Sequence, residues 1–349
     1  QLCHKYPKGR PGQTQILFAP SITLTLAMGP VQQALGDIDF QADAWFLDGF
    51  SPAKNPNMWT PQVMKQIGAH TKKGGSLSTF TVAGSVRRGL LEAGFDIEKS
   101  PGFGRKREML KAVIPAPSSP TPKQLSSVPS VAIIGAGIGG VATAWHCQRY
   151  GMDVTLFDAE APAAGASGNP IGLLMPRVEA NDTPSARFFR DAFLYALQFY
   201  HVTAPEHIKM MGGTIAPDED RPSRFVKLMS SHMWHKDDFH LRGDGTLFVT
   251  HGATLSPQKA IHQILGHGDI HVQRKRVTSI QQDHRYPVSL YSDENCVWHG
   301  DHVVIANGVH AHQFMKCDSI LKASRGQIDI FKDSPPSHII TSGSYIAPF

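Results

Sequence analysis

The 349-residue sequence has few cysteines and no long apolar run. Its four cysteines form no C-x-x-C pair and do not stand near histidine at the spacing of zinc ligands, which argues against a disulfide scaffold and a zinc finger. We therefore expect reduced thiols and a cytoplasmic location. No run of about 18 apolar residues occurs, so the sequence predicts no membrane-spanning helix.

The sequence also lacks the usual patterns of a metal site. None of its 18 histidines belongs to an H-E-x-x-H or related motif, so we expect no metal and treat the histidines as surface or core residues. Global disorder is excluded as well, because hydrophobic residues make up 41% of the chain and charged residues 18%. The length predicts two domains. Oligomeric state is not fixed by the sequence, and a monomer is the working expectation.

A Pro- and Ser-rich segment, residues 115–130, divides the chain. It reads PAPSSPTPKQLSSVPS and cannot bury much apolar surface, so we interpret it as a linker between domains at residues 1–114 and 131–349. Residues 1–115 contain 14 Lys and Arg but only 8 Asp and Glu, whereas the remainder has 20 and 21. This basic excess favours an anionic partner such as nucleic acid, and a merely soluble basic surface is the alternative.

Strand and helix patterns alternate before the linker. We expect strands at 44–47 and 75–80, helices at 61–70 and 85–93, and an antiparallel pair formed by 95–99 and 109–114. Such a pattern predicts part of an α/β sheet. Asp48 directly follows the first of these strands, at the carboxyl end where open α/β sheets place their ligands.

The strongest motif follows the linker. A strand at 131–134 leads into GAGIGG and a helix at 140–150, and a second strand at 153–157 ends at Asp158. Gly135, Gly137 and Gly140 match G-x-G-x-x-G, in which the glycines allow a tight turn, close approach of a pyrophosphate and close helix packing. Asp158 follows Gly140 by 18 residues, close to the usual position of an acid that binds ribose. The unit therefore predicts a dinucleotide site.

The residues alone leave the choice between FAD and NAD open. The segment 165–178 reads GASGNPIGLLMPRV, and its small residues could lie against a flavin while Ser167 and Asn169 bind its phosphate or ribitol. Gly, Ser and Asn also form ordinary loops. A later apolar strand at 303–306, followed by Asn307 and Gly308, fits a sheet edge over a dinucleotide.

Several strings resemble known families. VAIIGAGIGG, VTLFD, GASGNPIGLL, VVIANG and the RGQ of residues 325–327 occur in the order found in FAD-dependent amine oxidases of the D-amino-acid oxidase and glycine oxidase type. DAWFLDGFSPAKNPNMW at 43–59 and GFGRKREML at 102–110 resemble an S-adenosylmethionine-dependent methyltransferase. Together they resemble the bifunctional tRNA 5-methylaminomethyl-2-thiouridine biosynthesis proteins.

This resemblance implies an α/β fold in two parts. The first is a partial Rossmann-like methyltransferase domain, and the second is a partial FAD-binding domain with an inserted substrate subdomain. It also implies a function in two steps on the wobble uridine of tRNA. FAD-dependent oxidation removes the carboxymethyl group from 5-carboxymethylaminomethyl-(2-thio)uridine, and S-adenosylmethionine then methylates the resulting aminomethyl group.

The resemblance assigns roles to particular residues. Asp48 would orient the substrate amine, with Phe50 and Pro52 shaping the pocket. FAD contacts would come from Gly135, Gly137, Gly140, Asp158, Ser167, Gly168 and Asn169. Arg325 and Gln327 would lie near the flavin or the substrate carboxylate. The tRNA backbone would bind Arg87, Arg88, Arg105, Lys106, Arg107 and Lys111, for which a solvated face is the alternative.

The sequence departs from this family at both ends. No glycine-rich S-adenosylmethionine loop precedes residue 43, and the family's last glycine-rich stretch does not follow residue 349. We therefore expect an internal piece of a longer protein that does not transfer methyl groups by itself and retains FAD weakly. Two other functions remain open: an oxidase of free glycine or sarcosine, and an inactive tRNA-binding fragment.

Overall fold

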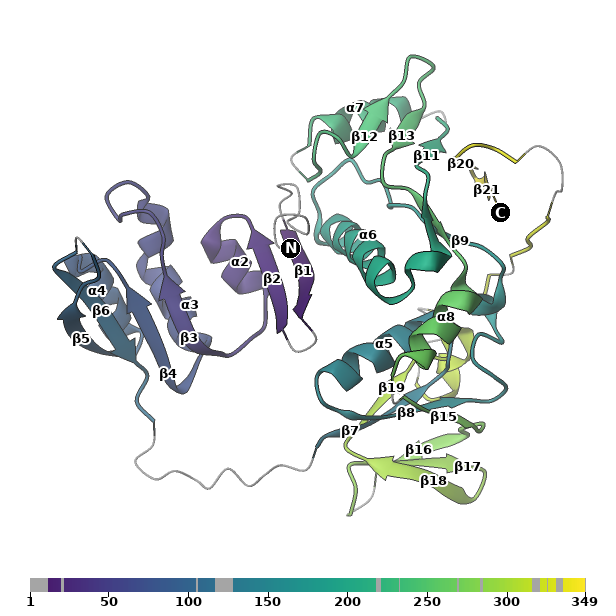
Figure 1. Cartoon of the computed structure of the whole chain (residues 1–349), viewed down its shortest axis with the longest axis horizontal. Helices are drawn as coiled ribbons and strands as arrows, with labels where there is room; N and C mark the ends of the chain where they lie inside the picture. Colours follow the sequence, from purple (N-terminus) through teal and green to yellow (C-terminus); the bar gives the residue numbers. More distant parts are fainter. Residues whose placement is uncertain are drawn as a thin grey trace. The chain divides into compact units, whose positions relative to one another are not determined.

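The structure is a computed structural model that describes residues 12–19, 22–104, 106–116, 128–217, 221–231, 233–268, 270–282, 285–315, 321–324, 326–330 and 335–348. The chain divides into two compact units (Figure 1). Unit 1 comprises Gln1–Leu26 and Leu125–Phe349, and unit 2 comprises Ala27–Gln124. Both are α/β, which confirms the expected fold class. Most of the predicted linker lies outside the described residues, and the predicted domain limits stay a prediction.

Unit 2 contains a four-stranded sheet and the helices that cover it. Its elements are α2 (Val31–Asp37), β3 (Ala42–Leu47), η1 (Pro56–Trp59), α3 (Pro61–Ala69), β4 (Thr71–Thr79), α4 (Gly84–Glu92), β5 (Asp96–Pro101) and β6 (Glu108–Val113). The strand order is β3-β4-β6-β5, with β3 and β4 parallel and β6 antiparallel to both of its neighbours. The sequence predicted each strand and both α3 and α4 to within a few residues.

One face of this sheet is covered by helices. Leu77 on β4 is 1% exposed and packs with Val63 and Met64 of α3 and Val86 of α4. Alternation along a strand sends the next side chain to the opposite face. Phe46 on β3, which is 82% exposed, lies on that second face. The core of unit 2 is therefore on the helix side only, within the part of the chain that the structure describes.

The carboxyl ends of three strands meet at one edge of the sheet. β3 and β4 are parallel, and β5 has their direction because β6 runs antiparallel to both β4 and β5. The residues that follow these strands are Asp48, Phe80 and the loop 102–107. All three therefore lie at the same edge, which is uppermost in Figure 1.

Unit 1 is larger and contains several sheets. Its helical elements are α5 (Ile138–Arg149), η2 (Ala166–Gly168), α6 (Pro184–Thr203), η3 (Pro205–His207), α7 (Arg221–Met229), α8 (Pro257–Gly266) and η4 (Gly308–Gln313). Its first strands are β1 (Gly12–Ala19), β2 (Ile22–Met28, which continues into unit 2), β7 (Ser130–Ile134), β8 (Asp153–Asp158), β9 (Gly172–Leu174), β10 (Ile208–Met210) and β11 (Gly213–Ile215). The later strands are β12 (Phe239–Leu241), β13 (Leu247–Val249), β14 (Ala253–Leu255), β15 (His271–Arg274), β16 (Ser279–Gln281), β17 (Val288–Ser292), β18 (Asn295–Gly300), β19 (His302–Ile305), β20 (Ile339–Ser342) and β21 (Ser344–Ile346).

A parallel sheet of order β15-β8-β7-β19 forms the centre of unit 1. Its middle strand, β7, is almost wholly apolar and buried, as expected for a strand covered on both faces. Ile133 and Val131 pack towards α5, α6 and α8, whereas Ala132 and Ile134 pack towards the small sheet β16-β17-β18. The central sheet is therefore the middle one of three layers, with both of its faces covered.

A hydrogen-bonded pair fixes the beginning of β7. The Asp301 carboxylate accepts hydrogen bonds from both the backbone N–H and the hydroxyl of Ser130, each at 2.8 Å. These bonds hold the pKa of Asp301 below its usual range. Because Asp301 lies in the turn between β18 and β19, the contact aligns β19 with β7.

A second part of unit 1 is built around the sheet β12-β13-β11-β20-β21. Phe225 and Leu228 of α7 pack on Leu247 and Val249 of β13. This part corresponds to the expected inserted substrate subdomain. The last strand of this sheet, β21, spans Ser344–Ile346.

The structure also shows elements that the sequence reading did not predict. They include the hairpin β1–β2, the 20-residue helix α6, and helix α8. No helix among the described residues is long and apolar enough to cross a lipid bilayer.

A histidine is half-buried where α5 meets α6. The Tyr195 hydroxyl of α6 lies 2.5 Å from Nε2 of His146 on α5. Burial lowers the pKa of His146 below its ordinary value of 6.5, and the nearby Arg149 lowers it further. Burial raises the pKa of Tyr195 to about 12, so the phenol keeps its proton at neutral pH and donates to the neutral imidazole.

This pair predicts a pH-dependent stability. The lowered pKa means that the folded state binds the histidine proton less tightly than the unfolded state does. The contribution of neutral His146 to the free energy of unfolding is therefore complete above pH 6.5. It is lost as the pH falls through the lowered pKa of this histidine in the folded protein. We expect the free energy of unfolding of unit 1 to fall on acidification and His146→Gln to flatten this slope. Denaturant titrations between about pH 7.5 and about pH 5 measure it.

His262→Gln is the matched control. The His262 ring is exposed on α8, and among the described residues its one hydrogen bond is with the Gln258 carbonyl of its own helix. Equal pH slopes for the wild-type protein and His146→Gln would contradict the prediction.

Candidate functional site

A cavity of about 580 Å³ lies at the carboxyl ends of the central strands of unit 1. Its walls include Ile134 at the end of β7, Asp158 at the end of β8, Val277 after β15 and Ala306 after β19. β8 pairs with one edge of β7, and β19 pairs with its other edge. The strand order therefore changes direction at β7. Open α/β sheets bind their ligands at such a point.

Two glycines allow α5 to begin directly behind this cavity. Gly135 has φ +109°, and a Cβ there would lie 2.6 Å from the Ala306 carbonyl oxygen. A Cβ on Gly140 would collide with the Gly135 carbonyl oxygen. Both positions therefore require glycine: at Gly135 for the backbone conformation and the space, and at Gly140 for the space alone.

The helix itself begins earlier than the sequence predicted. α5 starts at Ile138 with Gly137 as its N-cap, and the first helical hydrogen bond runs from the Val141 N–H to the Gly137 carbonyl at 3.0 Å. The Ser167 hydroxyl accepts the Ile138 N–H at 3.0 Å. The following N–H groups of the first turn have no partner within the helix and, with the helix dipole, favour an anion in the cavity.

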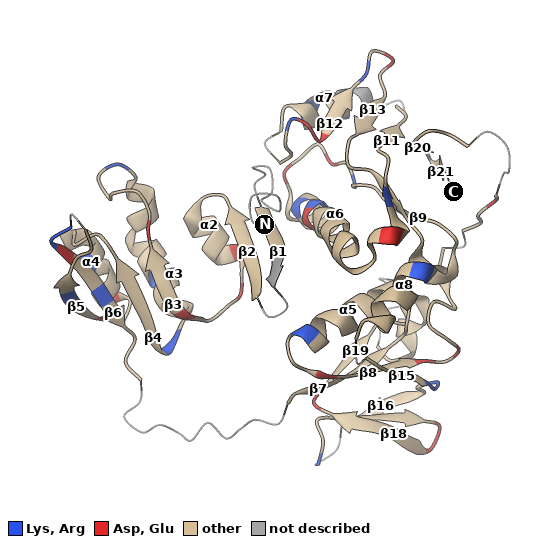
Figure 2. Cartoon of the chain, in the orientation of Figure 1, with Lys and Arg blue, Asp and Glu red and all other residues tan. Residues whose placement is uncertain are grey.

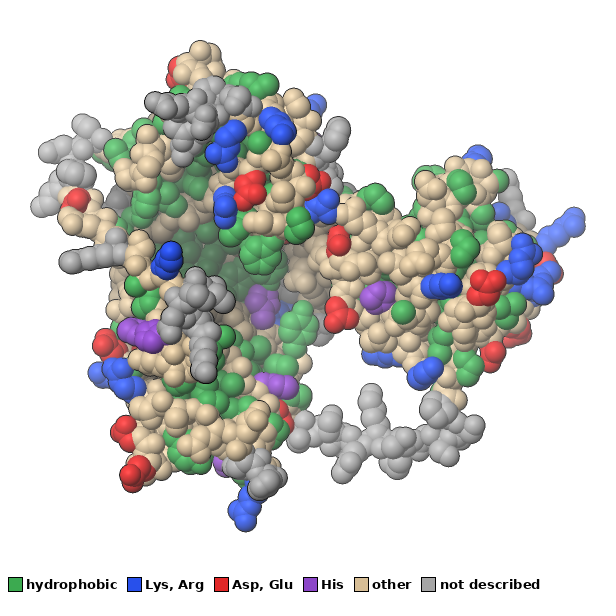
Figure 3. Space-filling view, turned by 180° about the vertical axis from the view of Figure 1, so that it is seen from behind, with side chains coloured by type: hydrophobic (Ala, Val, Ile, Leu, Met, Phe, Trp, Pro, Cys, Tyr) green, Lys and Arg blue, Asp and Glu red, His purple; other side chains and the backbone are tan. Residues whose placement is uncertain are grey.

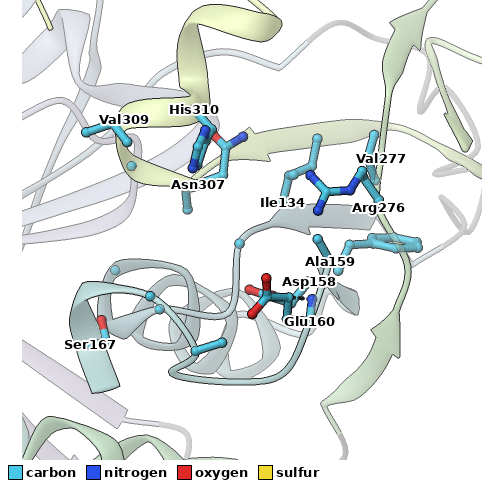
Figure 4. Close-up of a pocket in the computed structure, with 18 of the residues that line it drawn as sticks. Ile134, Asp158, Ala159, Glu160, Ser167, Arg276, Val277, Asn307, Val309 and His310 are labelled. Atoms are coloured by element: carbon cyan, nitrogen blue, oxygen red, sulfur yellow. Dashed lines mark hydrogen bonds between the residues drawn. The ribbon is translucent and has the colours of Figure 1, made fainter. Parts of the chain in front are cut away.

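Asp158 occupies the end of β8, where the sequence placed it. One carboxylate oxygen accepts the Ala136 N–H at 2.8 Å, and the other accepts the Glu160 N–H at 3.0 Å. These bonds hold the side chain at the wall of the cavity, as Figure 4 shows for Asp158 and Glu160. The second lone pairs of both oxygens can still accept hydrogen bonds from ribose hydroxyls.

The remaining wall contains residues that the sequence analysis did not assign as contacts. Lys275 and Arg276 follow β15, and the Arg276 guanidinium is directed into the cavity (Figure 4). Asn307 and His310 come from the segment after β19. The basic pair could have been recognised from the K-R dipeptide that directly follows a strand.

The cavity fits a flavin dinucleotide. Its volume, the helix N-terminus and the Asp158 carboxylate suit a pyrophosphate and a ribose, and Arg276 adds a cation beside them. The carboxamide oxygen of Asn307 is buried yet has no hydrogen-bond partner among the described residues. Such an oxygen is costly unless a ligand donates to it. The residues that would hold FAD are therefore the α5 N-terminus, Ser167, Asp158, Arg276 and Asn307.

Not all of the predicted FAD contacts reach the cavity. Gly135, Gly137, Asp158 and Ser167 line it, whereas Gly140 lies behind the helix start. Gly168 and Asn169 are not among the lining residues; a Cβ on Gly168 would lie 2.6 Å from the Ala163 carbonyl oxygen, so its role is to close the loop.

Of the two predicted substrate residues of unit 1, Gln327 is described and does not line the cavity. Gln327 is exposed, and its amide donates to Asp329 at 2.9 Å. Arg325 lies outside the described residues.

Unit 2 has a second, smaller cavity of about 280 Å³ at the end of β3. Trp45 and Trp59 contribute aromatic walls, and Asp48 is the one charged residue among those that line it. A carboxylate with aromatic rings suits a cationic group such as an amine or a sulfonium. Asp48 lines this cavity and its role stays a prediction, whereas Phe50 and Pro52 belong to the adjacent loop and do not line the cavity.

The loop that carries Asp48 is held in place by contacts with η1. The buried Trp59 indole N–H donates to the Phe50 carbonyl at 2.7 Å. A Cβ on Gly49 would lie 2.8 Å from the Met58 side chain, so the loop packs closely on η1. Phe50 is 73% exposed as a consequence, with its ring directed outward.

The predicted tRNA contacts are spread over unit 2. Figure 2 shows Lys and Arg residues on α4, β5 and β6, and in the space-filling view of Figure 3 basic side chains gather at this end of the unit. Arg87 and Arg88 are exposed in the first half of α4, and Lys106 and Arg107 are exposed in the loop before β6. Lys111 is exposed further along β6, away from this edge, and Arg105 lies outside the described residues.

No group of three or more His, Cys, Asp or Glu side chains suited to a metal ion occurs in the part of the chain that the structure describes.

Comparisons with known proteins agree with these two sites. A family model described as S-adenosyl-L-methionine-dependent methyltransferase matches residues 1–115, and one described as FAD dependent oxidoreductase matches residues 130–348. The chain is 35% identical to the tRNA 5-methylaminomethyl-2-thiouridine biosynthesis bifunctional protein MnmC of Maricaulis maris over 99% of this chain and 57% of that protein. It is 33% identical to the protein of the same name from Magnetococcus marinus, over 94% of this chain and 53% of the relative.

The chain thus spans about half the length of the curated relatives it matches. Among solved structures it is similar to glycine oxidase from Geobacillus kaustophilus, with 16% identity, a TM-score of 0.42 and coverage of 53% of this chain and 57% of that one. It is also similar to MNMC2 from Aquifex aeolicus, with 30% identity, a TM-score of 0.28 and coverage of 34% and 37%. The sequence and family matches confirm the resemblance and the cofactors it implied, FAD and S-adenosylmethionine.

Two neighbouring glycines test the architecture of the larger site. We expect Gly140→Ala to destabilise unit 1 by about 1–3 kcal/mol, because the methyl group cannot fit against the Gly135 carbonyl. Gly139→Ala is the matched control: no atom lies within 4 Å of its added Cβ, so it should be neutral or stabilise by up to about 1 kcal/mol. Thermal and denaturant unfolding measure both. Equal stabilities of the two variants would contradict the packing argument.

Proposed function

The chain belongs to the FAD dependent oxidoreductase family through residues 130–348, and we propose that it serves, together with its methyltransferase segment, in modifying the wobble uridine of tRNA. The observation that carries this proposal is the joint presence of both segments in the order found in the MnmC proteins. The dinucleotide cavity of unit 1 and the acidic, aromatic cavity of unit 2 support it. Its tRNA partner implies a cytoplasmic site of action.

The first proposed reaction removes a carboxymethyl group from a secondary amine. A hydride leaves the carbon between the amine and the carboxylate, water adds to the resulting carbon–nitrogen double bond, and glyoxylate departs from the aminomethyl nucleoside. FAD, when bound, supplies the two-electron acceptor for this step. The chain's own contribution is positioning: the α5 N-terminus and Arg276 bind the pyrophosphate, and Asp158 binds the ribose. We propose that Arg325 and Gln327 lie near the substrate carboxylate.

The second proposed reaction methylates the aminomethyl group. The amine attacks the methyl carbon of S-adenosylmethionine, the bond between that carbon and sulfur breaks to release S-adenosylhomocysteine, and the methylated amine loses a proton. Asp48 lies at the carboxyl end of β3 on a loop held by Trp59, and its carboxylate would orient the amine and accept that proton. The basic residues of α4 and the loop before β6 would bind phosphates of the tRNA, bringing the wobble nucleotide to this edge of unit 2.

The substrate class is tested by comparing a modified tRNA with free amino acids as substrates. We expect the chain, supplied with excess FAD, to convert tRNA carrying 5-carboxymethylaminomethyl-2-thiouridine and to release glyoxylate, and to leave free glycine and sarcosine unchanged. Mass spectrometry of the nucleosides and a glyoxylate assay follow the reaction. Turnover of the free amino acids without turnover of the tRNA would instead identify an amino-acid oxidase.

The dinucleotide site is tested at Asp158. Removing hydrogen bonds to a charged group costs about 1.5–3 kcal/mol, so we expect Asp158→Ala to weaken FAD binding by about 10- to 150-fold. Asp153→Ala is the control, because this exposed acid lies at the other end of the same strand. Titration of FAD, followed by its fluorescence, measures the affinities, and thermal unfolding without FAD checks the fold. Unchanged binding in Asp158→Ala would rule out this site.

A further inference from the structure

One phenylalanine of unit 2 stands in a conspicuous position. Phe103, in the turn between β5 and β6, is 94% exposed. The turn is closed by two backbone hydrogen bonds, Gly102 N–H to the Arg107 carbonyl at 3.1 Å and Lys106 N–H to the Phe103 carbonyl at 3.2 Å. Gly104 has φ +61°, a conformation that few other residues adopt at low cost. The described residues of this loop thus hold the phenyl ring in solvent.

The position of this turn connects it to the Asp48 site. It follows β5 and therefore lies at the same edge of the sheet as the ends of β3 and β4. The Lys106 ammonium lies 5.2 Å from the centre of the Phe80 ring, and Phe80 packs edge-on against Trp59 at 6.4 Å. Trp59 in turn holds the Phe50 carbonyl in the Asp48 loop. A continuous set of contacts therefore links the turn to the loop that carries Asp48.

The charge around Phe103 is positive. Lys106 and Arg107 are both exposed, and neither forms an ion pair within the described residues. The acid next to them, Glu108, is paired with Lys99 at 3.0 Å. Arg88 of α4 lies near the same edge, with its guanidinium folded back towards Gly84 at the start of the helix. An aromatic ring flanked by cations is the arrangement that binds single-stranded nucleic acid by stacking and phosphate contact.

We propose that Phe103 stacks on an unpaired nucleobase of the RNA substrate while Lys106 and Arg107 bind the adjacent phosphates. This inference rests on the proposed function and adds to it the way in which the substrate is held. The base that stacks would be a neighbour of the one presented to Asp48, because both loops lie at one edge. A single-stranded loop offers such a base, whereas a duplex keeps its bases stacked inside.

The test uses the full chain and a fluorescent RNA hairpin with the sequence of an anticodon stem-loop. Stacking on an aromatic side chain is worth about 1–3 kcal/mol per base, so Phe103→Ala should weaken binding by about 5- to 150-fold. Phe103→Trp should bind at least as well as the wild-type protein, and Phe103→Leu should be as weak as Phe103→Ala because it lacks a π face. Fluorescence anisotropy measures all four proteins.

Salt dependence separates the two kinds of contact. We expect Phe103→Ala to weaken binding equally at every salt concentration, and Arg107→Gln to reduce the slope of log affinity against log salt by about 1. Phe188→Ala is the matched control, since Phe188 is another exposed ring, 68% accessible, on α6 of unit 1. It should leave RNA binding unchanged.

The outcomes separate this inference from the proposed function. If the wild-type protein binds the hairpin and Phe103→Ala binds within twofold of it, stacking is wrong and the tRNA function stands. If Phe103→Leu binds like the wild-type protein, the contact is merely apolar and stacking is again wrong. If the wild-type protein does not bind the hairpin even at low salt, the proposed tRNA partner itself fails. Loss of self-association in Phe103→Ala, with unchanged RNA binding, would identify a protein contact instead.

Discussion

The close approach of two backbones determines the larger site. Helix α5 begins so near the end of β7 that the backbone of residue 140 touches the carbonyl of residue 135, and no side chain fits between them. This approach directs the first turn of the helix at the cavity and sets the distance from that turn to Asp158 on β8. The other walls, from β15 and β19, serve a ligand only because this contact fixes where its phosphates can lie.

Both units use the same geometric solution for different chemistry. In each, parallel strands end at a common edge, and residues just beyond a strand contribute polar groups to the cavity. In unit 1 the edge presents N–H groups and a basic side chain, which suit a phosphorylated ligand. In unit 2 it presents a carboxylate and aromatic rings, which suit a cation. The chemistry therefore depends on the loops, whereas the sheet supplies a rigid support.

Local patterns predicted the parts of the fold that depend on local interactions. The G-x-G-x-x-G turn, β8 with its terminal acid, and the strands on either side of Asp48 follow from apolar runs and turn residues close together in sequence. The walls contributed by Arg276 and His310 did not, because these residues reach the cavity through the pairing of strands distant in sequence. Helix α6 was not predicted because its wide apolar face, from Ala186 to Tyr200, does not stand out as a motif. Gly168 and Asn169 do not line the cavity, so their FAD contacts stay a prediction, and the space around Gly168 is needed by the backbone of the loop itself.

The hydrogen bonds between Ser130 and Asp301 join residues 171 positions apart in the sequence. During synthesis on the ribosome, β7, α5 and β8 therefore emerge long before β19 can complete the sheet beside them. The early segment leaves the apolar edge of β7 unpaired for many seconds, at a rate of about 5–20 residues per second. Such an edge is open to incorrect strand pairing. Because the chain is synthesised from its N-terminus, the nascent sheet gains its order and its cavity only when β19 pairs with β7.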